Sequence, residues 1–252
     1  MEDLLERKEP DKNHLKLFDE MAVKMKEVIK DSDIPQPTNN GESSAYLNLF
    51  KYWNDFLIKG KLPSYNWIVG NVFRASDLGG ASIFMGCKEL AIFQFYSTEF
   101  IDFLAKSIKS IGSKKIIEIG AGDGLLSHFL QQKGIDIIPT DDHSRDDITH
   151  PMRVEKLSHK EALEKHNPEV VLISWEELDY TYSIDVLNYH SVKCIVIIGE
   201  YDGGCTGSKK LWNYENQDTD NPYCLARTDN CMFGENVHKH TGVWIFYPKK
   251  ST

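Results

Sequence analysis

The stretch that decides the fold is residues 116–126, with the sequence IIEIGAGDGLL. It opens with a short apolar run that is typical of a buried strand, and it ends where a helical pattern begins. Glycines occupy positions 120, 122 and 124 between the two patterns. Glycine permits a tight turn and lets the backbone approach a ligand closely. We therefore expect a strand, a ligand-binding glycine loop and a helix, in that order.

The chain on both sides of this loop alternates between strand and helix patterns. Short runs rich in β-branched residues predict strands over residues 116–119, 135–139, 151–157, 170–173 and 194–198. Helical patterns lie between them over residues 125–133, 160–166 and 184–190. Such alternation predicts an α/β fold with a doubly wound, mostly parallel sheet and helices on both faces. Two later extended runs, residues 225–233 and 242–247, predict an antiparallel pair that completes the sheet.

The first third of the chain shows helical patterns and turn formers without the alternating strand patterns. Apolar residues recur at helical spacing over residues 15–29, and turn formers with two prolines follow over residues 31–41. A second helix is expected from Ser43 or Ser44 to about Gly60, followed by irregular chain over residues 61–82. A third helix should begin at Ser97 or Thr98 and end at Gly112. We predict a helical N-terminal cap over residues 1–90 and a cofactor-binding domain over residues 91–252.

Composition narrows the functional classes. The chain has 252 residues and a formal net charge of −9, which argues against wholesale binding of nucleic acid or an anionic membrane. No apolar run reaches the roughly 18–20 residues that a membrane helix needs. The first sixteen residues are acidic and polar, and the five cysteines form no CxxC pair. These features predict reduced thiols and a cytoplasmic location.

The pattern E-x-G-x-G-x-G over residues 118–124 resembles motif I of the class I S-adenosylmethionine-dependent methyltransferases. A nicotinamide-cofactor fingerprint would need its third glycine at position 125, where Leu125 stands. The resemblance covers roughly residues 90–247 and implies a seven-stranded, Rossmann-like methyltransferase fold whose last strand is antiparallel. Residues 175–204 are also similar to a group of little-characterised methyltransferase-like proteins, which implies no particular reaction.

The resemblance implies a set of cofactor-binding residues. The loop residues Gly120, Ala121, Gly122 and Gly124 would pass beneath the amino-acid tail of S-adenosylmethionine, and Glu118 would engage its ammonium group directly or through water. An acid at the tip of the second strand accepts hydrogen bonds from the ribose hydroxyls. Asp141 is the candidate, with Asp142 as the register alternative, and a helix N-cap is a second role open to either.

Two further segments carry candidate site residues. Residues 93–98 resemble the segment that covers the methionine end of the cofactor, which points to Tyr96; packing in the core is the alternative. At the tip of the fourth strand stand Ser174, Trp175, Glu176 and Glu177, where substrate meets the methyl group in this fold. Ser174 would also contact the cofactor. Amino-directed members have a D/N/S-P-P-aromatic signature there, and this chain lacks the two prolines, which argues against transfer to a base amine.

The remaining predictions concern substrate binding and metal. Trp67 and Arg74 lie in chain expected to be irregular, and Glu200 follows the fifth strand, so these three are candidates for substrate binding. Packing is the alternative for Trp67 and Trp175, and a solvated helix start is the alternative for Glu176 and Glu177. A metal-assisted reaction would need an acid where Ser174 stands, so no metal is predicted.

These observations predict an S-adenosylmethionine-dependent methyltransferase that acts on a small molecule or a protein side chain by in-line transfer. Three alternatives stay open. The first is a nucleic-acid base methyltransferase with a basic groove around Lys209, Lys210 and Arg227. The second is a catalytically silent module that binds the cofactor. The third is a nicotinamide-dependent oxidoreductase, which Leu125 disfavours. The sequence does not fix the oligomeric state.

Overall fold

A computed structural model describes residues 48–57, 59–73, 87, 90–145, 148, 153–178, 180–201, 204, 206–229 and 240–249. The helix predicted over residues 15–29, the linker over residues 31–41 and the candidate residue Arg74 lie outside these ranges. Within them, no helix is both long enough and apolar enough to cross a membrane.

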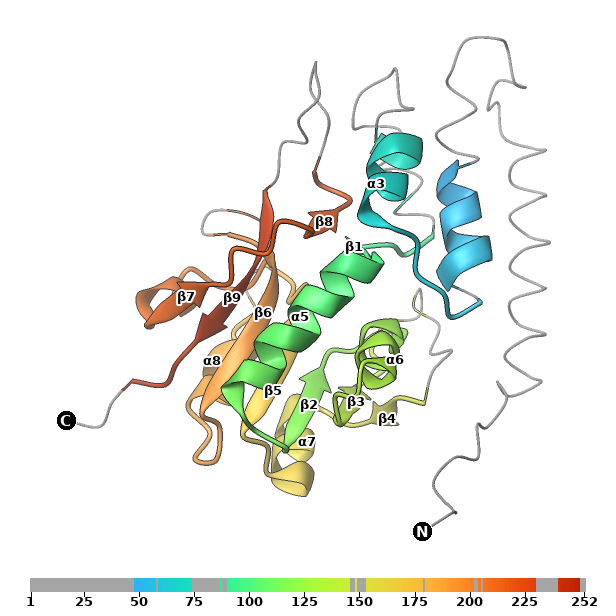
Figure 1. The fold of residues 1–252 in the computed structure, drawn as a ribbon. Helices are drawn as coiled ribbons and strands as arrows, with labels where there is room; N and C mark the ends of the chain where they lie inside the picture. The colour runs from blue at the N-terminus through green and yellow to red at the C-terminus, as the bar shows by residue number, and fades with distance from the viewer. Residues whose placement is uncertain are drawn as a thin grey trace, which may run out of the picture.

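The centre of the molecule is a seven-stranded sheet (Figure 1). Its strands are β2 (Ile116–Ile119), β3 (Ile137–Asp141), β4 (Glu155–Lys156), β5 (Val170–Ser174), β6 (Cys194–Glu200), β7 (Asn216–Asp218) and β9 (Thr241–Phe246). They lie in the order β4-β3-β2-β5-β6-β9-β7. The five from β4 to β6 pair in parallel, while β9 is antiparallel to both β6 and β7. The predicted fold class is confirmed: this is the Rossmann-like methyltransferase fold, with its last strand antiparallel.

Helices cover both faces of the sheet. One face packs against α5 (Thr98–Ile111) and α6 (Leu125–Gln132), and α5 lies across the front of the sheet in Figure 1. The other face packs against α7 (His159–His166), α8 (Tyr182–Leu187) and the short 3-10 helix η3 (Leu211–Asn213). Side chains along each central strand alternate between the two cores, because neighbouring residues of a strand point to opposite faces. The central strands are therefore apolar on both sides.

The predicted third helix is confirmed in both its caps. Ser97 precedes α5 and its hydroxyl accepts the N–H of Phe100 at 3.0 Å. Gly112 follows α5 in the left-handed conformation, with φ of 78°. Glycine is favoured there because it has no Cβ to clash with the backbone.

The sequence predicts irregular chain over residues 61–82, but part of this stretch is helical. Residues 65–73 form α3 (Tyr65–Ile68) and the π-helical segment η2 (Val69–Phe73). Ser64 caps α3, because its hydroxyl accepts the N–H of Trp67 at 3.2 Å. Together with η1 (Tyr52–Leu57), these segments share one apolar core with α5, α6 and the sheet. How the chain divides into domains stays a prediction.

The predicted pairing of residues 225–233 with residues 242–247 is wrong. The partner of β9 at the edge of the sheet is β7, whose three residues are all exposed. An exposed edge strand needs no apolar side chains, so its sequence carries no strand signal. The apolar residues of β8 (Leu225–Ala226) pair instead with β1 (Gln94–Phe95) in a separate two-stranded sheet.

Candidate functional site

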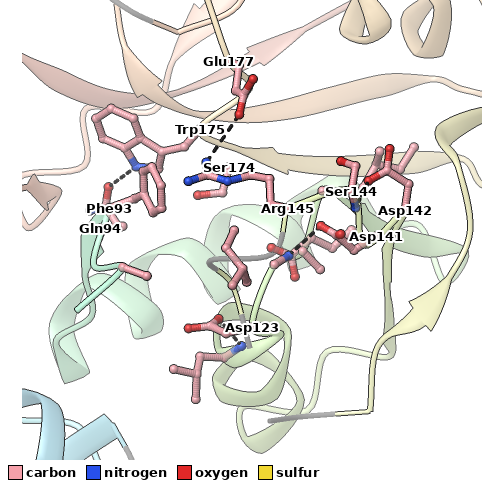
Figure 2. Close-up of a pocket in the computed structure, with 18 of the residues that line it drawn as sticks. Phe93, Gln94, Asp123, Asp141, Asp142, Ser144, Arg145, Ser174, Trp175 and Glu177 are labelled. Atoms are coloured by element: carbon pink, nitrogen blue, oxygen red, sulfur yellow. Dashed lines mark hydrogen bonds and ion pairs between the residues drawn. The ribbon is translucent and has the colours of Figure 1, made fainter. Parts of the chain in front are cut away.

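A pocket of about 600 Å³ opens at the edge of the sheet where the parallel strands end. Ligands of open α/β sheets bind at this edge, outside the carboxyl ends of the strands. Ten of the predicted site residues line the pocket: Tyr96, Glu118, Gly120, Ala121, Gly122, Asp141, Asp142, Ser174, Trp175 and Glu177. Figure 2 shows several of them converging from separate strand ends and loops.

The glycine loop between β2 and α6 forms one wall. Gly120, Gly122 and Gly124 have φ angles of 70°, 55° and 73°, in the region that favours glycine. A Cβ atom added at Gly120 would lie 3.1 Å from the hydroxyl oxygen of Tyr182. The positive φ therefore favours glycine at position 120, and a Cβ atom there would fit only if Tyr182 shifted slightly. Gly124 stands behind the loop as the N-cap residue of α6 and does not line the pocket.

The tip of β3 faces this loop. Asp141 Oδ2 accepts the N–H of Gly122 at 2.9 Å, and Oδ1 accepts the N–H of His143 at 2.7 Å. An ionised carboxylate has about four lone-pair sites, so both oxygens can still accept hydrogen bonds from a ligand. Asp142 is exposed and accepts the N–H of Ser144 at 2.9 Å, and hydrogen bonding from Ser144 lowers the pKa of Asp142. Neither acid caps a helix, since residues 142–145 form none.

Two carboxyl groups at the glycine loop, Glu118 at the end of β2 and Asp123 within the loop, have raised pKa values. Glu118 is 1% exposed, and its Oε2 accepts the hydroxyl of Ser127 at 2.5 Å. Burial raises the pKa of Glu118 to about 8. Burial likewise raises the pKa of Asp123 to about 6, although Asp123 Oδ1 accepts the N–H of Leu125 at 3.0 Å. Sequence reasoning missed Asp123 as a site residue, even though it stands inside the glycine motif.

These raised pKa values predict that stability falls as pH rises. Burial raises the pKa of Glu118 to about 8 and that of Glu176 to about 7, from a value of 4.5 for both. Between pH 4.5 and pH 8 these two groups bind more protons in the folded chain than in the unfolded chain. The free energy by which they stabilise the fold is therefore fully present below pH 4.5 and is lost as the pH rises to 8. Denaturant unfolding across this range should show the decrease, and Glu118→Gln should flatten it between pH 7 and pH 8. The exposed Glu164→Gln is the matched control. An unchanged slope in Glu118→Gln would contradict the assignment.

Trp175 follows β5 in a backbone conformation that is rare for its residue type. Its φ is 61°, a left-handed conformation that costs about 1–2 kcal/mol in a residue with a Cβ. Two hydrogen bonds hold it: its N–H donates to the carbonyl of Ile198 at 2.9 Å, and its indole Nε1 donates to Gln94 Oε1 at 3.3 Å. The indole lies 6.3 Å from the ring of Phe93, between centroids (Figure 2). Backbone strain of this kind gathers at functional sites, where surrounding structure maintains it.

Arg145 crosses the pocket from the loop after β3, and sequence reasoning did not find it. Its Nη1 lies 3.4 Å from Glu177 Oε1, and its guanidinium carbon lies 5.3 Å from the centroid of Phe93. The guanidinium carbon of Arg227 lies 4.1 Å from the same centroid. Phe93, Arg145 and Arg227 lie in three distant segments of the sequence, and only the fold brings these segments together.

The segment at residues 48–57 also reaches the site. Trp53 and Leu57 line the pocket, and the hydroxyl of Tyr52 accepts the N–H of Tyr96 at 2.6 Å. This bond fixes the backbone beside the predicted cofactor residue Tyr96. On the opposite wall, the rings of His159 and Tyr182 stack with centroids 5.7 Å apart.

Besides Gly124, three predicted residues are described but do not line the pocket. Glu176 is 2% exposed, and its Oε1 accepts the N–H of Ser183 at 2.8 Å in the first turn of α8. Burial raises the pKa of Glu176 to about 7. Glu200, the last residue of β6, is half-buried and does not line the pocket. Trp67 packs edge-on against Phe56, with centroids 4.9 Å apart.

Comparisons with known proteins give only distant similarities. No family model matches the chain, and no curated protein matches it. Among solved structures, it is similar to the methyltransferase domain of bacterial CtHen1-CN, with a TM-score of 0.37 and 12% identity, over 59% of this chain and 97% of that one. It is also similar to the methyltransferase domain of bacterial CtHen1-C, with a TM-score of 0.36 and 11% identity, over 59% and 96% of the two chains.

Proposed function

We propose that this protein is an S-adenosylmethionine-dependent methyltransferase that acts on a small molecule or a protein side chain. One observation carries the proposal: Asp141, at the tip of β3, accepts the N–H of Gly122 across the mouth of the glycine loop. This contact puts a carboxylate beside a loop that only glycine can form. The arrangement suits a nucleoside whose ribose hydroxyls bind Asp141 and whose tail lies over the loop.

The charges around the pocket fit a cationic cofactor. Six of the residues that line it are acidic: Glu118, Asp123, Asp141, Asp142, Glu177 and Asp185. S-adenosylmethionine has a sulfonium and an ammonium group, which this surface attracts. Glu118 would hold the ammonium as a carboxylate, because a cation beside a carboxyl group lowers its pKa and releases its proton. A nicotinamide dinucleotide would bring a pyrophosphate against the same carboxylates, and like charges at this range repel. The acidic lining therefore supports S-adenosylmethionine over the dinucleotide.

When bound, S-adenosylmethionine would supply an activated methyl group on a positively charged sulfur, for in-line transfer to a nucleophile of the substrate. The protein's task is mainly alignment, which can contribute about 7–11 kcal/mol. Ser174 and Trp175 stand at the strand tip where the nucleophile would lie. Glu177 lines the pocket and is placed to accept a proton from the substrate at a carboxylate oxygen. Glu176 and Glu200, by contrast, lie outside it.

Of the three basic residues expected of a nucleic-acid base methyltransferase, Arg227 lies beside this pocket, with its guanidinium carbon 4.1 Å from the centroid of Phe93, and the two lysines do not. Lys209 and Lys210 are exposed in a turn just before η3, and neither lines it. Among the described lining residues, Arg145 is the basic side chain besides His159, and acidic residues surround it. A polyanionic backbone would be repelled by that lining. This distribution favours a small molecule or a protein side chain as the substrate.

Calorimetric titration with S-adenosylmethionine, S-adenosylhomocysteine and NAD tests the cofactor class. We expect both sulfur nucleosides to bind and NAD not to bind. Binding of NAD alone would contradict the proposal. A screen with S-adenosylmethionine labelled in its methyl group, against small-molecule and protein extracts, then tests for activity. Binding without any labelled product would instead support a catalytically silent module.

A further inference from the structure

A cationic group of the chain itself already occupies part of the pocket. The guanidinium of Arg145 lies between the ring of Phe93, at 5.3 Å, and the carboxylate of Glu177, at 3.4 Å. Figure 2 shows Arg145 reaching toward Glu177, with Trp175 and Phe93 beside it. An aromatic face and a carboxylate together form a favourable surface for a cation. Arg145 thus marks a subsite for positive charge next to the strand tip.

The contact between Arg145 and Glu177 is a weak one. The Arg145 and Glu177 side chains are 38% and 52% exposed, and a single pair of atoms joins them at 3.4 Å. Exposed ion pairs of this kind contribute about 0–1 kcal/mol, since water and salt screen them and both side chains lose freedom. A second cation can therefore displace Arg145 from Glu177 at little cost.

The surroundings decide which sign of charge a ligand should have here. Asp141 and Asp142 line the pocket on the loop side of Arg145, and Asp185 lines it from α8. His159 lies 3.8 Å from Asp185. An anionic ligand drawn to Arg145 would have to approach these carboxylates, whereas a cationic ligand gains from them. The guanidinium of Arg227, 4.1 Å from the centroid of Phe93, opposes a cation there, but the carboxylates that line the pocket outnumber it. The charge distribution therefore favours a cation.

We propose that the subsite formed by Phe93, Trp175 and Glu177 binds a cationic nitrogen group of the substrate, an ammonium or a guanidinium, in the place that Arg145 holds. The inference rests on the proposed function, because it assigns the substrate side of the same pocket. Arg145 then acts as a resident competitor, and substrate binding moves its guanidinium away from Glu177. The cation can come from a lysine or arginine of a polypeptide or from a small polyamine.

The test uses the full chain saturated with S-adenosylhomocysteine, and calorimetry with three blocked tripeptides of sequence Ala-X-Ala, where X is lysine, arginine or glutamate, and with spermidine. Lysine, arginine or spermidine probes should bind more tightly than the glutamate probe. Arg145→Gln should tighten cation binding by up to about 5-fold, since it removes a weak competitor. Glu177→Gln should weaken it by about 10-fold or more, since it removes a charged acceptor.

The controls separate this inference from the proposed function. Both variants should keep the parent affinity for S-adenosylhomocysteine, which also shows that they fold. If the parent does not bind S-adenosylhomocysteine, the proposed function is contradicted. The comparison of the probes can then be repeated without the nucleoside, and it still shows whether the subsite prefers a cation or an anion. Preferred binding of the glutamate probe, lost in Arg145→Gln, would overturn the inference. Tighter binding of spermidine than of the lysine probe would identify a polyamine source, and the reverse a polypeptide; either result supports a cation subsite.

Discussion

Asp141→Asn is expected to lower the affinity for S-adenosylhomocysteine by about 100-fold. Asp141 is the carboxylate at the tip of β3 that accepts the N–H of Gly122. Hydrogen bonds to a charged acceptor contribute about 1.5–3 kcal/mol each, and the ribose has two hydroxyls to donate. Nucleoside at 100 times the parent dissociation constant stabilises the parent by about 2.7 kcal/mol, and a 100-fold weaker variant by about 0.4 kcal/mol. Thermal unfolding with and without the nucleoside measures this difference.

Asp142→Asn is the matched control for this experiment. Asp142 is the neighbouring acid, it also lines the pocket, and its carboxylate accepts a local N–H, from Ser144. We expect Asp142→Asn to bind the nucleoside within about 5-fold of the parent, the range of an exposed charge interaction. A large loss in Asp142→Asn together with no loss in Asp141→Asn would move the ribose site to the neighbouring residue. No loss in either variant would remove the ribose site from this strand tip.

Trp175→Ala should lower the turnover number by about 100-fold and leave the affinity for S-adenosylhomocysteine nearly unchanged. The strained backbone at Trp175 and its bond to Gln94 hold the indole at the tip of β5, beside Phe93. A misplacement of about 1 Å between reacting groups can cost about 100-fold in rate. The measurement is steady-state methyl transfer to the substrate found by the labelling screen, alongside calorimetry with the nucleoside.

Trp212→Ala is the control of the same chemical type. Trp212 packs on the other face of the sheet, edge-on to Trp244 and Phe246, at centroid distances of 5.2 and 5.3 Å. Its loss should lower the unfolding temperature without changing the turnover number. If Trp175→Ala loses turnover and nucleoside affinity to the same extent, its placement on the substrate side is contradicted.

The parts of the fold that sequence reasoning predicted best are the buried central strands. The strand predicted over residues 116–119 is β2 itself, and β5 and β6 begin at the predicted residues. Such strands are apolar on both faces, so a short continuous run of β-branched residues marks them. The exposed β7 has the sequence Asn-Gln-Asp, which gives no such signal. The pairing of β1 with β8 joins residues 94 and 226, and no local pattern encodes so distant a contact.

Some residues of the candidate site could likewise be predicted from the sequence and others could not. The glycine loop and Asp141 were predictable, because a strand end and a tight turn are local features of the sequence. The choice between Glu176 and Glu177 was not, since adjacent residues point to different sides where a strand ends. One lies in the pocket and the other supports α8. Arg145, Phe93 and Trp53 line the same pocket only because tertiary packing brings their segments together. Residue type alone could not identify them as site residues.

The most direct test of the nucleoside site is a crystal structure of the protein with S-adenosylhomocysteine. We expect the ribose hydroxyls to lie within hydrogen-bond distance of Asp141. We also expect the amino-acid tail to lie over Gly120 and Gly122, with its ammonium toward Glu118. Density for the nucleoside at another place on the protein, or a protein that crystallises without it at saturating concentration, would contradict the assignment of this pocket.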